Sequence, residues 1–167
     1  LVLDRKKKKA LVKDFINPGP CDITENLVLT EPYYDYRGRN VFDKSLLPFV
    51  KQNLYDNDIL KANVAELRNN FMNNAQSLLH GDLHSGSIFI NDSDIRVFDS
   101  EFSFYGPMGY DIGNVIGNLV FPYIVQKAYL KKDKKGNEQF IKWLGSTIQV
   151  IFDQTFDKNN YFYTITL

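Results

Sequence analysis

Cysteine and histidine are scarce in this sequence of 167 residues, which contains a single cysteine, Cys21, and two histidines, His80 and His84. One cysteine excludes an internal disulfide, and these three residues are too few for a cysteine-rich zinc cluster. Because the sequence cannot form an internal disulfide, it needs no oxidising compartment, and a cytosolic location fits best.

An excess of one charge and long apolar runs are also absent. Lys and Arg total 20, as do Asp and Glu, so the overall balance favours neither a nucleic-acid partner nor an anionic membrane. No apolar run approaches the roughly 18 residues that span a bilayer. The first residues, LVLDRKKKKALV, have no small-residue cleavage site and therefore indicate a helix, not a signal peptide.

The length is sufficient for one hydrophobic core. The chain starts at Leu1, not at a methionine, and residues 161–167 (YFYTITL) stop inside an apolar run. We therefore expect residues 1–167 to form a single partial domain of a longer protein.

Hydrophobic spacing predicts four helices. The first covers Asp4 to Ile16 and is ended by the prolines of residues 17–20 (NPGP). The second covers Ile59 to Phe71, with Asn57 or Asp58 as its cap. The others cover Asp111 to Tyr129, expected to be largely buried, and Glu138 to Phe156, whose aromatic stripe we assign to the core.

Shorter elements are predicted between these helices. Residues 26–31 form a short strand or a helical turn, and residues 35–40 and 131–137 are polar or charged loops. The central region indicates a strand at Ser77 to Leu79, a polar loop at His80 to Gly86, and strands at Ser87 to Ile90 and Ile95 to Phe98 joined by a turn. Short strands therefore flank two polar sites.

The two polar sites together offer the groups that phosphoryl transfer needs. Such a reaction requires a carboxylate beside the attacking hydroxyl and oxygen ligands for Mg²⁺ on the nucleotide phosphates. Asp82 lies in a His-x-Asp loop like that of protein kinases, and Asp99 ends the following hairpin, where a metal-binding aspartate belongs. We expect His80 to hold the loop by hydrogen bonds.

One position departs from the protein-kinase pattern. Five residues after Asp82, where kinases carry a metal-binding asparagine, this sequence has Ser87. A serine hydroxyl is a shorter and weaker ligand, so another residue should complete the metal site. Glu101 is the candidate, because residues two apart in an extended segment point the same way.

Three segments closely resemble the 5-methylthioribose kinase family, a branch of the aminoglycoside-phosphotransferase-like kinases. They are residues 80–88 (HGDLHSGSI), 98–104 (FDSEFSF) and 105–113 (YGPMGYDIG). Residues 17–32 (NPGPCDITENLVLTEP) are similar as well, so the resemblance extends from near the start to about Gln126. It implies an α+β fold: the mainly helical C-terminal lobe of a protein-kinase-like structure, with a small β-hairpin at the catalytic site.

The resemblance also implies roles. Asp82 matches the catalytic base that contacts the sugar, and Asp99 and Glu101 match carboxylates that bind Mg²⁺ and ATP. Ser100 lies between them in the ATP site, where the family usually has proline, and Asp111 matches an aspartate that braces the catalytic loop. Family members phosphorylate the anomeric hydroxyl of 5-methylthioribose in methionine salvage, and they act as homodimers.

Other family features are not found in these residues. No glycine-rich nucleotide loop or strand lysine precedes the Asp82 loop, and we expect them in an N-terminal lobe ahead of Leu1. The family's final helices, with a sugar-binding arginine, would follow Leu167. We therefore expect residues 1–167 to be inactive alone.

Two alternatives stay open at this point. A non-catalytic remnant or interaction module is compatible with every motif above. A metallophosphoesterase, suggested by the Gly-Asp-x-His element at residues 81–84, is less favoured because two histidines cannot furnish a dinuclear site.

Overall fold

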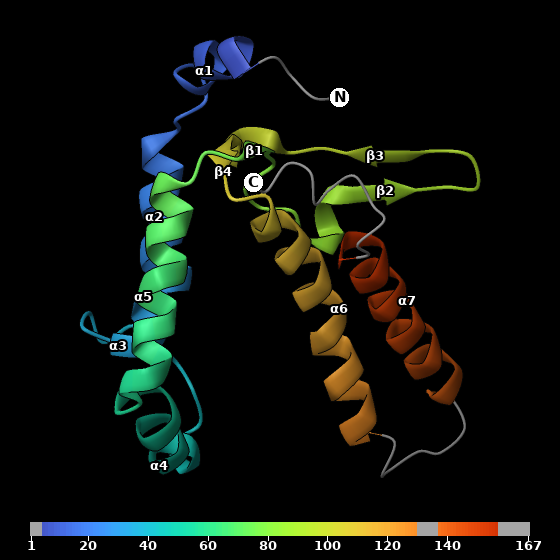
Figure 1. Cartoon of the computed structure of the whole chain (residues 1–167). Helices are drawn as coiled ribbons and strands as arrows, with labels where there is room; N and C mark the ends of the chain where they lie inside the picture. Colours follow the sequence, from blue (N-terminus) through green and yellow to red (C-terminus); the bar gives the residue numbers. More distant parts are fainter. Residues whose placement is uncertain (1–4, 130–136, 157–167) are drawn as a thin grey trace. The chain divides into compact units, whose positions relative to one another are not determined.

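The computed structural model describes residues 5–129 and 137–156. Within these residues the chain is mainly helical and carries two small antiparallel sheets of two strands each (Figure 1), which confirms the predicted α+β class. None of the described helices is long and apolar enough to cross a membrane. The expected loop at 131–137, Asn137 apart, and the apolar segment 161–167 lie outside the described residues.

The described chain divides into two compact units. The helical unit comprises residues 5–79 and 102–107, and the loop unit comprises residues 80–101, 108–129 and 137–156. The single partial domain expected for residues 1–167 stays a prediction.

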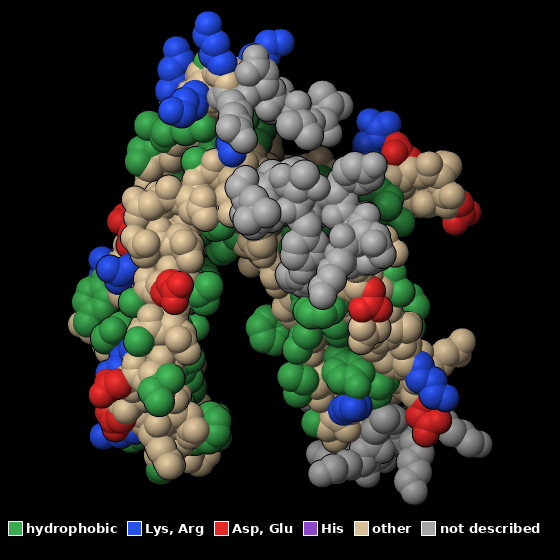
Figure 2. Space-filling view, viewed as in Figure 1, with side chains coloured by type: hydrophobic (Ala, Val, Ile, Leu, Met, Phe, Trp, Pro, Cys, Tyr) green, Lys and Arg blue, Asp and Glu red, His purple; other side chains and the backbone are tan. Residues whose placement is uncertain are grey.

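The helical unit contains most of the short elements. In chain order these are α1 (Arg5–Val12), α2 (Pro18–Leu29), α3 (Glu31–Tyr34), the 3-10 turn η1 (Lys44–Leu46), α4 (Leu47–Val50), the π-helical turn η2 (Lys51–Tyr55), α5 (Asp58–Asn73), β1 (Ser77–Leu79) and β4 (Phe104–Gly106). The lysines of α1 are largely exposed, and Figure 2 shows basic side chains gathered over this helix.

The prolines after α1 start a helix where we expected them only to end one. α1 ends at Val12, four residues before the predicted Ile16, and α2 begins at Pro18. Proline suits the first position of a helix because the amide hydrogen that it lacks would have no helical partner there. Residues 26–29 therefore belong to α2, so the helical alternative for this segment is confirmed and the strand is wrong.

α5 confirms the prediction made from hydrophobic spacing. The Asn57 side chain caps it by accepting a hydrogen bond from the Leu60 amide at 3.0 Å. Val64 and Phe71 are buried, and the rings of Phe71 and Phe104 lie 4.9 Å apart, so α5 packs against β4. β4 pairs with β1 in antiparallel register, with Leu79 opposite Phe104.

The buried carboxylate of Glu31 forms ion pairs with two arginines of the loop that follows α3. Glu31 is 2% exposed and binds Arg39 through both carboxylate oxygens, with Arg39 Nε donating to Oε2 at 2.9 Å. Arg37 Nη1 lies 3.4 Å from Oε1. The Arg39 hydrogen bond is the main reason that the pKa of Glu31 falls below its ordinary value.

The loop unit contains the predicted hairpin and the last two helices. Its elements are the 3-10 turn η3 (Ser85–Ser87), β2 (Ile88–Ile90), β3 (Ile95–Val97), α6 (Gly109–Tyr129) and α7 (Glu138–Phe156), and the 3-10 turn η4 (Ser100–Phe102) follows β3. β2 and β3 lie side by side in Figure 1 and pair antiparallel, with Ile88 opposite Val97. At the turn, the Asn91 side chain accepts hydrogen bonds from the amides of Ser93 and Asp94 at 2.9 Å.

α6 and α7 pack on each other but leave much apolar surface exposed. Ile141 and Leu144 of α7 are buried. Trp143 is 53% exposed and Phe121 of α6 is 70% exposed, so the largely buried helix and the core aromatic stripe that we expected are wrong. A helix packed against one neighbour buries only one stripe of its surface. Figure 2 shows hydrophobic side chains along both helices.

Candidate active site

The start of the polar loop is held by Asp111, in the first turn of α6. Asp111 is buried, and its carboxylate accepts hydrogen bonds from two successive amides: His80 N–H to Oδ2 at 2.6 Å and Gly81 N–H to Oδ1 at 3.0 Å. Gly81 has a φ of 87°, a conformation that glycine adopts readily and other residues rarely. These contacts set the backbone direction immediately before Asp82.

His80 connects this loop to the second polar site. Its Nε2 lies 2.8 Å from the carbonyl oxygen of Phe98, which can only accept, so Nε2 carries the ring hydrogen. Nδ1 is then an acceptor and receives the amide hydrogen of Asp82 at 3.4 Å. Through one imidazole, the backbone at Asp82 is joined to the residue that precedes Asp99.

Asp99 follows the hairpin in an unusual backbone conformation. Its φ is 66°, in the left-handed region, which costs a residue with a side chain roughly 1–2 kcal/mol, although aspartate enters it more readily than most. Asp99, Ser100 and Glu101 are all exposed. The amide of Phe98 donates to the carbonyl of Ser87 at 3.1 Å, which extends the hairpin up to this site.

The middle of the loop contains two residues that we did not assign from the sequence. Ser85 Oγ donates a hydrogen bond to Oδ1 of Asn118 at 3.3 Å. Asn118 is seven residues after Asp111 and therefore lies on the same face of α6. His84 contacts Gly86, Ser87 and Asp82. The signal that could have found His84 is its position two residues after Asp82, within the same loop.

The carboxylates could serve a Mg²⁺ ion that shares its ligands with a nucleotide. The described residues hold no cluster of three or more His, Cys, Asp or Glu side chains placed for metal binding. Mg²⁺ in kinases takes one or two carboxylates and completes its shell with waters and phosphate oxygens. Asp99 and Glu101 are both exposed and fit that donor set. The extended segment that we expected to point them the same way is wrong, because Asp99 has a left-handed backbone and Glu101 lies in the 3-10 turn η4. The convergence of Asp82, Asp99 and Glu101 on one cleft stays a prediction.

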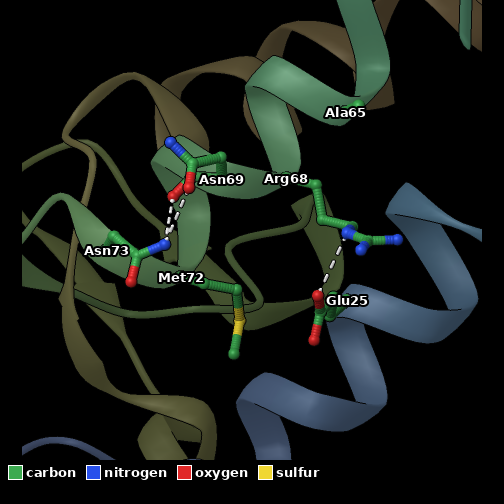
Figure 3. A pocket seen from close by; sticks show the side chains of 6 residues that line it. All are labelled: Glu25, Ala65, Arg68, Asn69, Met72 and Asn73. Atoms are coloured by element: carbon green, nitrogen blue, oxygen red, sulfur yellow. Dashed lines mark hydrogen bonds and ion pairs between the residues drawn. The ribbon is translucent and has the colours of Figure 1, made fainter. Parts of the chain in front are cut away.

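A small polar pocket lies elsewhere, between α2 and α5 of the helical unit (Figure 3). It has a volume of about 190 Å³, and Glu25 and Arg68 form an ion pair at 3.1 Å across it. Asn69, Met72 and Asn73 of α5 complete its wall together with Ala65. None of the residues assigned to the active site from the sequence lines this pocket.

Comparison with known proteins identifies the family. The phosphotransferase enzyme family matches residues 30–141. A methylthioribose kinase of Pectobacterium atrosepticum is 53% identical over 117 residues, and one of Yersinia enterocolitica is 50% identical over 116. Each alignment covers 70% of this chain and 29% of the relative, so the chain spans less than a third of their length. Since the family match includes both polar sites and more than half of the sequence, the chain belongs to the phosphotransferase enzyme family.

Proposed function

We propose that the complete protein containing these residues transfers the γ-phosphoryl group of ATP to the anomeric hydroxyl of 5-methylthioribose, giving 5-methylthioribose 1-phosphate in methionine salvage. Relatives that carry the name methylthioribose kinase support the choice of substrate. The structural observation that carries the proposal is the pair of amide hydrogen bonds from His80 and Gly81 to Asp111, because it orders the backbone that presents Asp82. The resemblance further implies a homodimer, and the scarcity of cysteine favours a cytosolic location.

In this proposal Asp82 acts as the general base. Its side chain is 55% exposed and therefore accessible to a substrate hydroxyl. The carboxylate accepts the hydroxyl proton while the sugar oxygen bonds to the γ-phosphorus and the bond to the bridging oxygen of ATP breaks, releasing ADP. Asp99 and Glu101 would hold Mg²⁺, which neutralises charge on the phosphate oxygens when bound.

His80 and Asp111 contribute by position. His80 links the Asp82 segment to the segment of Asp99 by two hydrogen bonds, and Asp111 accepts hydrogen bonds from the two amides ahead of the base. Such restraint matters because phosphoryl transfer depends mainly on positioning and charge stabilisation.

Two substitutions in the complete protein test the assigned roles. Asp82→Asn should lower turnover by about 10²–10⁴-fold, the usual share of a general base, while ATP binding with Mg²⁺ stays close to wild type. Asp99→Asn should weaken the binding of Mg²⁺-ATP as well. Turnover is measured by ADP release with 5-methylthioribose, and binding is measured by calorimetry.

Asp92→Asn is the matched control, because Asp92 is exposed in the hairpin turn and its side chain makes no hydrogen bond to the described residues. If both active-site variants bound nucleotide as wild type does, the division of roles would be wrong. If the wild-type protein bound Mg²⁺-ATP without turning over the sugar, the non-catalytic alternative would be favoured. Residues 1–167 lack a glycine-rich loop, so we propose that they are inactive alone and that the complete protein must be assayed.

The metallophosphoesterase alternative gains no support from the site. Each of the two histidines uses its Nδ1 as an acceptor for a backbone amide, His80 from Asp82 and His84 from Gly86. A dinuclear centre needs several imidazoles facing a common point, and the part of the chain that the structure describes contains no such cluster.

A further inference from the structure

His84 lies between the proposed base and a buried serine and has no role in the mechanism given above. Its Nε2 is 3.2 Å from Ser87 Oγ and 3.8 Å from Oδ2 of Asp82. Ser87 is 3% exposed, whereas the Asp82 side chain is 55% exposed. One ring nitrogen therefore faces a buried hydroxyl and an exposed carboxylate.

The hydrogen on that nitrogen follows from the other side of the ring. Nδ1 of His84 lies 3.0 Å from the amide nitrogen of Gly86. A backbone amide can only donate, so Nδ1 must be an acceptor and the hydrogen of the neutral ring is on Nε2. Nε2 can therefore donate to Ser87 Oγ or to the Asp82 carboxylate.

The local backbone is suited to this ring position. His84 caps the 3-10 turn η3 through the bond from Gly86. A Cβ atom at Gly86 would lie 2.8 Å from Cε1 and 2.9 Å from Nδ1 of His84, closer than a side chain tolerates. Only glycine at position 86 leaves room for the ring where it lies.

We propose that His84 is a positioning residue for the phosphoryl transfer, an inference that rests on the proposed function. Its one Nε2 hydrogen, shared between Ser87 Oγ and Oδ2 of Asp82, restrains Oδ2 and leaves Oδ1 to accept the proton of the sugar hydroxyl. The 3.8 Å separation closes to hydrogen-bond distance by a small rotation of the exposed Asp82 side chain. Contacts of this kind are often longer in a protein without its substrate.

Two substitutions separate positioning from capping. His84→Asn keeps an acceptor where Nδ1 lies and preserves the cap, since asparagine is among the best capping residues, but it places no donor at Nε2. In His84→Gln the longer side chain places an amide donor near the Nε2 position but loses the acceptor that caps η3 through the Gly86 amide. We expect His84→Asn to lower kcat by about 10- to 100-fold, with an unchanged KM for ATP and an unchanged melting temperature.

His84→Gln should retain most of the kcat and melt at a lower temperature, a pattern that a merely structural role would reverse. Gly86→Ala, which displaces the ring, should lower kcat as His84→Asn does. Asp92→Asn is the control and should behave as wild type. Wild-type kcat in His84→Asn, or a lower kcat in His84→Gln than in His84→Asn, would overturn the proposal.

A second measurement tests the contact between His84 Nε2 and the Asp82 carboxylate without measuring turnover. It therefore distinguishes a failure of this inference from a failure of the proposed function. In protein labelled with ¹⁵N-histidine, the His84 resonances should show a protonated Nε2, and Asp82→Asn should shift the Nε2 signal while Asp92→Asn leaves it in place. A protonated Nδ1, or an Nε2 signal that does not respond to Asp82→Asn, would refute the inference. If wild type lacked sugar kinase activity and the Nε2 signal still responded, the proposed function would fail and the contact would stand.

Discussion

Replacement of Asp111 by asparagine tests how firmly the polar loop is held. The carboxylate accepts two charge-assisted hydrogen bonds, each of which contributes about 1.5–3 kcal/mol. Asparagine has the same shape but no charge and a single acceptor atom, so its amide group must face one of the two backbone donors. The surviving bond then contributes about 0.5–1.5 kcal/mol, and the total loss is about 2–5 kcal/mol.

Hydrogen exchange of the complete protein, followed by mass spectrometry, measures this loss of stability as faster exchange of the affected amides. Since about 1.4 kcal/mol corresponds to a factor of ten, a loss of about 2 kcal/mol or more should make peptides containing His80 and Gly81 exchange at least about 30-fold faster in Asp111→Asn. Peptides of the hairpin strands should change little, and Asp92→Asn should match wild type throughout. Wild-type protection of the His80 and Gly81 amides in Asp111→Asn would refute the assignment of Asp111 as the residue that holds the loop.

Two further predictions concern stability of the helical unit. The pKa of Glu31 is lowered in the folded protein, chiefly by Arg39, so its contribution to stability is present above the ordinary glutamate pKa of about 4.3 and is lost as the pH falls through the lowered value. Urea unfolding between pH 3 and pH 6 should therefore show a shallower acid dependence for Glu31→Gln than for wild type, and equal slopes would contradict the role of this ion pair. Gly106→Ala should cost about 1–3 kcal/mol, because a Cβ there would lie 2.4 Å from the buried ring of Phe104. Gly19→Ala, where a Cβ meets nothing within 4 Å, is its control in thermal unfolding, and equal melting temperatures for the two variants would show that the strand pair has room.

Elements that depend on local signals were predictable from the sequence. α5 begins beside a capping asparagine, and its apolar residues recur at helical spacing. α7 has the predicted bounds, Glu138 to Phe156, and the hairpin joins two short β-rich segments through a polar turn. In each case the residues that determine the structure lie within one element or its turn.

Elements that depend on distant partners were not predictable. β4 has three residues and exists because Phe104 and Leu79 pair across 25 positions of sequence. The burial of α6 and α7 depends on how many neighbours each helix has, which the spacing of apolar residues cannot tell. The same limit applied at His84, whose Nδ1 contact with the Gly86 amide depends on the turn that places the ring there.

The left-handed backbone of Asp99 is evidence about the proposed metal site that the sequence alone does not provide. Asn17 and Asp35 also have positive φ, and in each the side chain is engaged: Asn17 Nδ2 donates to the Ser103 carbonyl, and Asp35 accepts from the Asn40 amide, both at 3.1 Å. The Asp99 carboxylate makes no hydrogen bond to any residue that the structure describes. Glycine would adopt this backbone at lower cost, so an aspartate here has no structural explanation among the described contacts. The exposed carboxylate at this strained position supports the proposal that Asp99 binds a cation held on nucleotide phosphates.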